Sequence, residues 1–341
     1  MTEALEINGS MGEGGGQILR TALALSLHLQ RPIHLVRIRA RRHRPGLRRQ
    51  HLTCVLAAAR LSQARVTGAE IGSQEITFIP GPIRPGRYTF DIGSAGSTTL
   101  LLQALLPPLL LASHPCHLTL KGGTHNPKAP PFDFLDRVLV PLLRRMGAKV
   151  ALTLRRPGFY PEGGGIMEVR IDPVVRLRPI DLPERGEIRR VCARAIVAGL
   201  PRHIGERELA VLARELPLSA GDLDLEELTG CGVGNVVMVT VRSRHITELF
   251  TGFGERGRKA EAVAGELARQ VRAYLDAGVP VGPHLADQLL VPMALASGGR
   301  FLTVPPTRHT TTNLQVIERF LPLRFDLETT TDRCWIRLNH Q

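Results

Sequence analysis

The residue with the clearest chemical potential in this sequence is His309, which lies in the stretch PPTRHTTTNLQVIERFLPLRF at 305–325. Residues 310–313 have short side-chain oxygens of the kind that cap helices, and apolar residues then recur at helical spacing. We therefore expect His309 to lie in the loop that leads into a helix. Because free N–H groups at a helix N-terminus attract phosphate, its imidazole is well placed to meet a nucleotide. A hydrogen-bonded loop histidine is the simpler alternative.

A glycine-rich stretch near the N-terminus, GEGGGQ at 12–17, would let the backbone approach a ligand closely. It has neither the Gly-Lys-Ser/Thr of a P-loop nor the spacing of a dinucleotide fingerprint, so a glycine-rich turn is the default interpretation. Glu13 is the one carboxylate beside this turn in a cationic neighbourhood. There it could hold a divalent ion that bridges phosphates.

Residues 39–51, RARRHRPGLRRQH, combine several arginines with Gln50 and His51. Planar guanidinium groups suit a bidentate grip on phosphate oxygens. No acid stands between Glu13 and Glu70, although arginine recurs throughout that interval. The uncompensated positive field favours phosphate binding over the alternative, a solvated basic face.

Three further stretches are candidates for a site. HLADQ at 284–288 places polar side chains at a helix start, where Asp287 and Gln288 would cap the helix on spacing alone. DIGSAGS at 91–97 and KGGTHNPKAPP at 121–131 are typical of conformationally special loops. Gln103 lies inside an apolar helix, where it could simply satisfy a neighbouring backbone group. The sequence has no Ser–His–Asp elbow and no HExxH motif.

The elements that must position these residues recur in a fixed order. Apolar spacing predicts a helix that follows the glycine cluster within 12–30, a strand over 33–39, a second helix over 47–61 and strands at 75–79 and 88–92. Alternation in the strand over 33–39 places Arg37 and Arg39 on one side. The order repeats with a helix over 100–112, a strand at 117–123, a helix over 132–147 and a strand at 149–156.

A third unit follows a long interval, with helices expected within 285–299 and 313–323 and strands at 300–304, 324–328 and 334–338. No long βαβ crossover pattern is visible, so a repeated αβ layer explains the order better than one doubly wound sheet. The interval, about 185–278, contains clustered acids, a VVMVTV strand and an amphipathic helix over about 259–275. These features indicate an inserted αβ domain.

Composition limits the classes of protein that fit. The chain has 341 residues, with 43% hydrophobic and 4% aromatic residues, which is typical of a globular protein with room for more than one domain. A formal net charge of +13 indicates a polyanionic partner, although an arginine-rich genome would also raise it. Five scattered cysteines without a CxxC pair favour a reducing, cytoplasmic location. We expect no signal peptide and no membrane association, because the most apolar run, 100–112, is short and contains prolines.

Seven stretches in order resemble the RNA 3′-terminal phosphate cyclases, and the match covers almost the whole chain. They are GEGGGQILR, RPGLRRQHL, IGSAGS, GGTHNPKAPPFDF, GFYPEGGG, HLADQL and the histidine that precedes TNLQVIERFLP. The resemblance implies an α+β fold of three repeated modules like the C-terminal domain of initiation factor 3, with a smaller αβ domain inserted before the third module. The catalytic domain would then comprise residues 1–184 and 279–341, and the inserted domain residues 185–278.

The resemblance also implies a reaction. Enzymes of this family are RNA-processing ligases that use ATP and Mg²⁺ or Mn²⁺ to convert an RNA 3′-phosphate into a 2′,3′-cyclic phosphate. They proceed through a covalent histidine–AMP intermediate and then an RNA-adenylate, releasing pyrophosphate and AMP. This chemistry is coherent, because a neutral imidazole nitrogen can attack the α-phosphorus of ATP.

Each expected role is carried over residue by residue. His309 matches the adenylated histidine, and Asp287 could orient or stabilise its imidazole. Glu13 matches the metal-contacting acid. The nucleotide pocket would be formed by Gln103, Pro130, His284, Leu285, Ala286, Asp287 and Gln288. The RNA phosphate end would be bound by Arg20, Arg39, Arg42, Gln50 and His51.

One departure and two alternatives remain open at this point. Position 284 has histidine where the family motif has a tyrosine that stacks on adenine, so stacking is expected to weaken and to depend on pH. A cyclase-like ribosome-assembly protein would keep the fold and the basic surface without the chemistry, but it would not need His309. An enolpyruvyl transferase would need phosphate-binding lysines, and the chain is poor in lysine. The sequence does not predict the oligomeric state.

Overall fold

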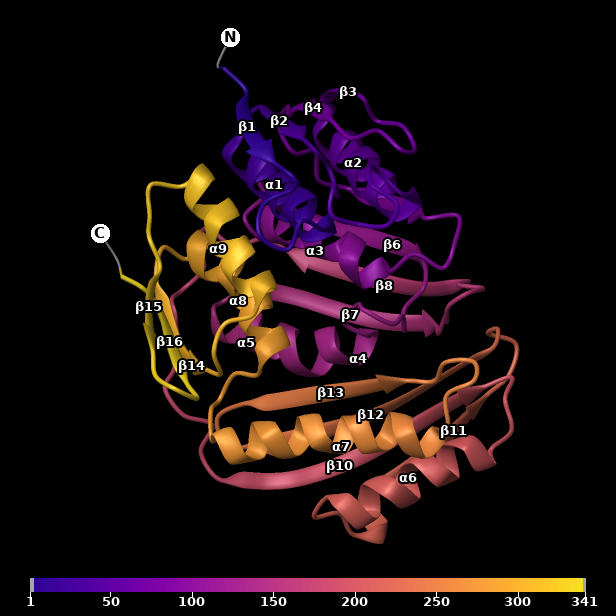
Figure 1. Cartoon of the computed structure of the whole chain (residues 1–341). Coiled ribbons are helices and arrows are strands. Elements are labelled where there is room, and N and C mark those ends of the chain that lie inside the picture. The colour runs from indigo at the N-terminus through magenta and orange to yellow at the C-terminus, as the bar shows by residue number, and fades with distance from the viewer. Residues whose placement is uncertain (1–2, 340–341) are drawn as a thin grey trace.

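Three sheets of identical topology make up most of the protein. The computed structural model describes residues 3–339 (Figure 1). In each of these sheets the first two strands are parallel and are joined through a helix. The last two strands are then added antiparallel, in the spatial order first, second, fourth, third. The α+β fold and the repetition are therefore confirmed.

The first repeat brings the glycine-rich and arginine-rich segments together. Its elements are β1 (Leu5–Asn8), α1 (Gly16–Leu29), β2 (Ile33–Val36), α2 (Arg49–Ser62), β3 (Arg65–Thr67) and β4 (Ile76–Ile79). The expected strand over 33–39 ends early. Arg37 and Arg39 both have a φ of 53°, so the chain turns there and does not present the two side chains on one strand face.

The second repeat has the same order of elements. They are β5 (Arg87–Asp91), α3 (Thr98–Leu110), β6 (Cys116–Gly122), α4 (Phe132–Phe134), the π-helical segment η1 (Leu135–Leu139), α5 (Val140–Arg145), β7 (Lys149–Arg156) and β8 (Gly165–Asp172). Strand β5, which the sequence placed at the end of the first module, pairs in parallel with β6 and opens the second sheet. The expectation that no βαβ crossover is present was therefore wrong.

The third repeat is interrupted along the chain. It comprises β9 (Ile180–Leu182), α8 (Pro283–Leu295), β14 (Gly299–Thr303), α9 (Arg308–Phe320), β15 (Asp326–Thr329) and β16 (Cys334–Leu338). Strand β9 pairs in parallel with β14, although more than 100 residues separate them. The intervening segment thus enters after the first strand of the third repeat. The sequence had predicted that it would enter before the repeat, and that prediction was wrong.

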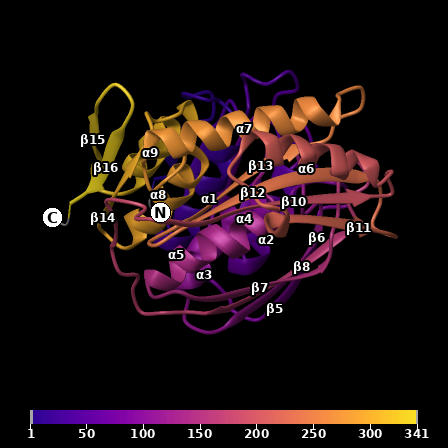
Figure 2. The same cartoon turned by 90° about the horizontal axis from the view of Figure 1, so that it is seen from below.

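The segment 185–278, expected to form an inserted domain, contains a sheet of different topology. Its elements are β10 (Ile188–Ala198), α6 (His203–Glu215), the 3₁₀ turn η2 (Ala220–Asp222), β11 (Leu223–Leu228), β12 (Gly234–Ser243), β13 (Thr247–Phe253) and α7 (Ala260–Ala277). The strand order is β11-β10-β12-β13, and α6 and α7 lie across one face of this sheet (Figure 2). Val237, Val239 and Val241 of β12 lie in a small core beneath these helices, and Val236 and Met238 lie in the large core of the repeats.

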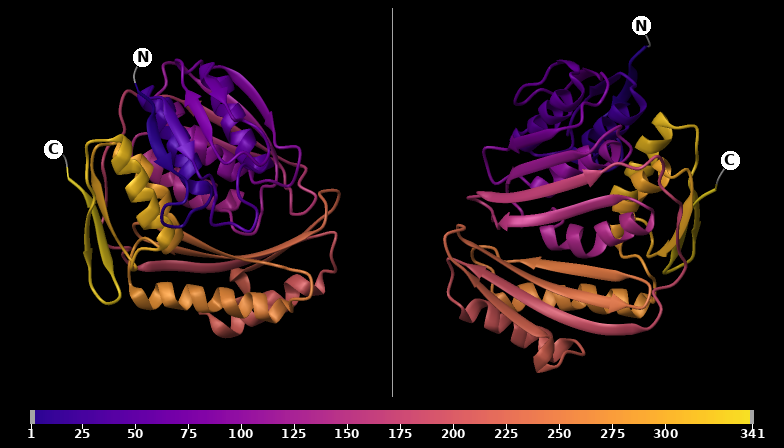
Figure 3. Two further views of the ribbon diagram at one scale, coloured as in Figure 1. Left: turned by 45° about the horizontal axis from the view of Figure 1, so that its top comes forward. Right: turned by 180° about the vertical axis from the view of Figure 1, so that it is seen from behind.

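The helices of the three repeats meet in the large hydrophobic core. Helix α1 packs against α2, α3 and α9, and α8 packs against α9 (Figures 1 and 3). The N-terminal turn of α1 therefore lies beside elements from the far end of the chain. Within the described residues, no helix combines the length and hydrophobicity needed to cross a bilayer.

Candidate active site

His309 lies in the first turn of α9 and not in the loop that precedes it. The N-cap of α9 is Thr307, whose hydroxyl oxygen accepts from the Thr310 N–H at 3.2 Å. The expectation that residues 310–313 would cap the helix was wrong, because Thr307 supplies the same kind of oxygen three residues earlier. The His309 side chain is 54% exposed, so its ring remains open to a ligand at the helix start.

Gln17 connects His309 to Asp287. Its side-chain N–H donates to a carboxylate oxygen of Asp287, and its Oε1 lies 3.0 Å from Nδ1 of His309. Because an ionised carboxylate only accepts, Asp287 fixes the orientation of the Gln17 amide, and Oε1 must then accept from Nδ1–H of His309. The lone pair is left on Nε2, the nitrogen that faces the open side. Asp287 therefore acts on the orientation of the imidazole through Gln17.

Asp287 is held from a second direction by α9. The side-chain N–H of Asn313 lies 3.1 Å from both the backbone oxygen and Oδ1 of Asp287, and Thr21 donates to Asn313 at 2.7 Å. Burial raises the pKa of Asp287, while the hydrogen bond from Gln17 opposes that shift. The helix cap of α8 is Gly282, so the interpretation of Asp287 and Gln288 as capping residues was wrong.

The His309 imidazole is kept neutral. Desolvation lowers its pKa first, and the nearby positive charges of Arg20 and Arg42 add to this, while Asp287 acts in the opposite direction. A neutral ring with Nδ1–H donated to Gln17 has a nucleophilic Nε2. His284 belongs to the same site, because His309 contributes to the lowering of its pKa after desolvation.

Glu13 is the carboxylate nearest to the reactive nitrogen. Its Oε1 lies 3.6 Å from Nε2 of His309, its side chain is 9% exposed, and neither oxygen has a hydrogen-bond partner among the described residues. Arg42 lies in close contact with it. Buried oxygens of this kind suit a divalent cation whose other ligands come from phosphates and water. No cluster of three or more His, Cys, Asp or Glu that could hold a metal ion occurs within residues 3–339.

The predicted phosphate-binding residues surround one histidine. Burial, followed by Arg20, Arg39, Arg48 and Arg42, lowers the pKa of His51 to about 3. His51 is therefore neutral, and its Nδ1 accepts from the Arg48 N–H at 3.3 Å. Its Nε2–H is left as a donor beside Gly16 at the start of α1. The structure thus gathers cations and one neutral donor at a helix N-terminus, which suits a phosphate group.

The arginines are not equivalent. Arg20 is buried, and its Nε donates to Oε1 of Gln103 at 2.6 Å, which joins the predicted phosphate and nucleotide positions. Nη1 of Arg39 donates to the carbonyls of Arg44 and Gly46, both at 2.8 Å, so this side chain also holds its own loop. Arg42 is 44% exposed at the rim.

Gln50 and Pro130 occupy the loops beside this cluster. Oε1 of Gln50 accepts from the Ser97 N–H at 2.7 Å, which attaches the start of α2 to the Gly93–Ser97 loop. The carbonyl of Pro130 accepts from Thr99 at 2.7 Å. Thr99 precedes Gln103 by one helical turn, so Pro130 borders the same face of α3.

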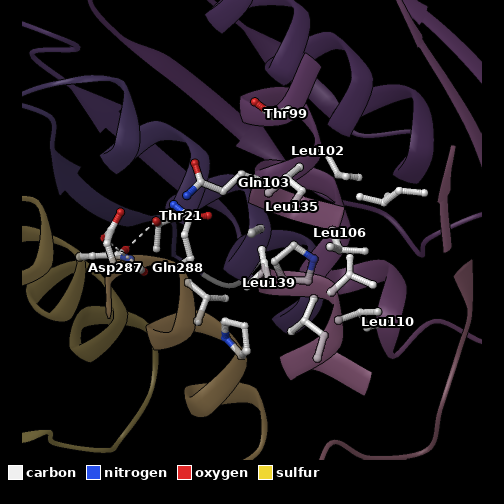
Figure 4. Close-up of a pocket in the computed structure, with 18 residues that line it drawn as sticks. Thr21, Thr99, Leu102, Gln103, Leu106, Leu110, Leu135, Leu139, Asp287 and Gln288 are labelled. Carbon is white, nitrogen blue, oxygen red and sulfur yellow. Dashed lines mark hydrogen bonds between the residues drawn. The ribbon is translucent and has the colours of Figure 1, made fainter. Parts of the chain in front are cut away.

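A cavity between α1, α3, α5 and α8 adjoins the site (Figure 4). Thr21, Gln103, Asp287 and Gln288 gather toward one end, and leucines of α3 and η1 line the rest. Leu285 and Ala286 do not line this cavity, and both side chains are buried in the large hydrophobic core. The sequence reasoning also missed Gln17 and Asn313. Gln17 closes the GEGGGQ stretch, and Asn313 was considered only as a cap.

Fold and site define an α+β repeat protein with a neutral histidine, a buried carboxylate and an arginine rim at the junction of its repeats. The family model for RNA 3′-terminal phosphate cyclase matches residues 11–327. The chain belongs to the RNA 3′-terminal phosphate cyclase family.

Relatives with that name match over nearly their whole length. The protein from Salmonella enteritidis is 47% identical over 339 residues, which cover 99% of this chain and 100% of the relative. Those from Koribacter versatilis and Pseudomonas fluorescens are 49% and 51% identical, covering 94% and 95% of this chain and 91% and 94% of the relatives. A solved structure of EPSP synthase from Acinetobacter baumannii is 11% identical, covers all of this chain and 66% of its own, and has a TM-score of 0.22, too low to support an argument.

Proposed function

We propose that this protein is an ATP-dependent enzyme that converts RNA 3′-phosphate ends into 2′,3′-cyclic phosphates through an adenylated His309. The observation that carries the proposal is the chain of contacts from Asp287 through Gln17 to Nδ1 of His309, which leaves Nε2 free beside Glu13. A protein that only binds RNA in ribosome assembly has no need of a prepared nucleophile.

In the first step Nε2 of His309 attacks the α-phosphorus of ATP, a P–N bond forms, and pyrophosphate leaves. The cavity lined by Gln103 and Gln288 is the candidate for the base, and His284, whose pKa is lowered by burial and then by His309, is the candidate contact for the adenosine. A Mg²⁺ or Mn²⁺ ion held by Glu13 would neutralise phosphate charge. Arg42 and the N-terminus of α9 add positive potential at the same place.

In the second step an oxygen of the RNA 3′-phosphate attacks the adenylate phosphorus, and the P–N bond breaks. The cluster of Arg20, Arg42 and His51 would bind that phosphate beside His309. The RNA 2′-oxygen then attacks the activated 3′-phosphorus, its proton is lost, and AMP departs. Since the 2′-hydroxyl is held vicinal to the phosphate, the last step benefits from a high effective molarity. This requirement makes RNA, not DNA, the substrate.

The experiment is incubation with α-labelled ATP and Mg²⁺ or Mn²⁺, followed by an RNA that ends in a 3′-phosphate. We expect label on the wild-type protein and none on His309→Ala, and an RNA product resistant to phosphatase. Label retained by His309→Ala, or an RNA end that stays sensitive to phosphatase, would reject the proposal.

A further inference from the structure

A buried carboxylate connects the segment 185–278 to the helix that carries part of the site. The chain passes from α7 directly into α8 through residues 278–282 (Figure 1). In that connection the Gly282 N–H donates to Oε1 of Glu248, on β13, at 2.5 Å. Oε2 of Glu248 accepts from the Leu249 N–H at 3.3 Å. Glu248 is 2% exposed, so its carboxyl group is withdrawn from water in order to make these contacts.

Glu248 supplies, from β13, the acceptor that the N3 Glu or Gln of a capping box gives to the N–H of the N-cap residue. Gly282 is the N-cap residue of α8 and has no side chain with which to cap the helix, and Pro283 follows it. An acceptor supplied from β13 therefore satisfies a backbone N–H at the start of α8. A Cβ at position 282 would lie 2.9 Å from Oε1 of Glu248, so the glycine and the carboxylate fit each other closely.

Neighbouring contacts fix the rest of the connection. The hydroxyl of Tyr274, at the end of α7, donates to the carbonyl of Pro280 at 3.0 Å, and Thr303 donates to the carbonyl of Val281 at 2.7 Å. Burial raises the pKa of Glu248 to about 8, and the N–H groups of Gly282 and Leu249 oppose that shift. The start of α8 is thus held jointly by the segment 185–278 and by β14.

The position of α8 matters for the site because His284 is the residue after Pro283, and Asp287 lies one turn further on. Asp287 fixes Gln17, which fixes His309. We propose that Glu248 is a positioning residue through which the segment 185–278 holds α8 in the register that ATP binding and His309 adenylation require. The inference rests on the function proposed above and gives this segment a role in it.

The experiment compares two buried acids of the same segment. Glu208, on α6, is 0% exposed and bonds to Asn235 at 2.9 Å, away from α8. We expect Glu248→Leu and Glu208→Leu to lower thermal stability alike. Only Glu248→Leu should raise the ATP concentration for half-maximal adenylation, by about 10-fold or more, with the KM for RNA unchanged. Glu248→Gln keeps a carbonyl acceptor for Gly282 and should return that ATP concentration to within about 3-fold of wild type.

A second variant covers the case in which Glu248→Leu does not fold. Gly282→Ala places a methyl group against the carboxylate, and it should weaken ATP use in a folded protein. Combining Gly282→Ala with Glu248→Asp in one protein should relieve the weakened use of ATP, because the shorter side chain leaves room for the methyl group. The inference is overturned if folded variants at 248 and 282 use ATP as the wild type does, or if Glu208→Leu impairs ATP use equally. Failure of the wild-type protein to become adenylated would instead reject the proposed function itself.

Discussion

At the scale of single residues, the amide of Gln17 decides which nitrogen of His309 carries the proton. Its two ends face partners of opposite kind, an acceptor at Asp287 and a donor at His309, so only one orientation satisfies both. A histidine with a free tautomer would present the wrong nitrogen part of the time. In the proposed reaction, the exposed ring would therefore be prepared for attack before the nucleotide binds.

The first prediction tests this assignment. Gln17→Met keeps the volume of the side chain but removes both hydrogen bonds, and we expect the rate of AMP incorporation to fall by about 10- to 100-fold, the usual cost of losing a partner that orients a functional imidazole. The rate is measured with labelled ATP at saturation. Gln270→Met, on the exposed face of α7, serves as the control and should react normally. A wild-type rate in folded Gln17→Met would show that the contact is incidental.

The second prediction concerns His51 and stability. Its pKa is about 3 in the folded protein, against 6.5 in the unfolded chain, so the unfolded state binds more protons between these values. Stability is therefore lost as pH falls below about 6.5. Between pH 7.5 and pH 5, the free energy of unfolding of the wild type should fall by about 2 kcal/mol more than that of His51→Gln.

Urea unfolding at pH 7.5 and pH 5 measures this difference. His114→Gln is the matched control, because His114 is exposed on a loop. This variant should unfold with the same pH dependence as the wild type. If His51→Gln showed that same dependence too, the depressed pKa of His51 would be refuted.

At the scale of elements, the start of α9 supports the site through its cap. The Thr307 hydroxyl accepts from the Thr310 N–H, and the two hydroxyl oxygens of Thr307 and Thr310 lie 3.0 Å apart. This turn sets the direction of His309, which is two residues after the cap. Local capping and catalytic geometry therefore depend on the same side chain.

The third prediction follows from that cap. Thr307→Ala should cost about 1 kcal/mol of the free energy of unfolding and slow adenylation, and Thr307→Ser should restore both because the oxygen returns. Thr311→Ala, in the same turn, removes only two 3.3 Å contacts to carbonyls and should change little. Urea unfolding and the labelling rate provide the readouts. Equal effects of Thr307→Ala and Thr311→Ala would rule out a specific role for the cap.

At the scale of the whole molecule, the first repeat carries a large share of the excess positive charge, with eleven arginines and no acid between Glu13 and Glu70. Arg42 is the most direct test of that concentration, since Arg39 also holds its loop through two carbonyls. An arginine that contacts an RNA phosphate releases counterions on binding, so its removal changes the salt dependence of affinity.

The fourth prediction is that Arg42→Gln will weaken binding of a 3′-phosphate RNA and make the slope of log K against log salt shallower by about 0.7. Fluorescence anisotropy over a salt series measures the slope. Arg269→Gln also removes one positive charge, but on the exposed face of α7 in the segment 185–278, and it should leave the slope at the wild-type value. Identical slopes for Arg42→Gln and wild type would place Arg42 outside the RNA contact.

The sequence by itself determined the helices and the family. Apolar residues at helical spacing located α1, α2, α3 and α7 to within a few residues, because that signal lies within a few turns of chain. The order of seven motifs predicted the family, and the matching family model confirms it. Strands β1, β3, β8, β9, β10, β11 and β13 were missed. For β1, β3 and β9 the reason is that three or four residues carry too little alternation to be recognised.

Only the tertiary structure decided how the site is connected. Gln17 is 292 residues from His309 and 270 from Asp287, and no local pattern links them. They meet because α1 packs against α9, and α9 against α8, in one core. The pairing of β9 with β14 across the segment 185–278 has the same origin. Periodicity reports which face of an element is buried, whereas the identity of the partner on that face depends on packing across the whole chain.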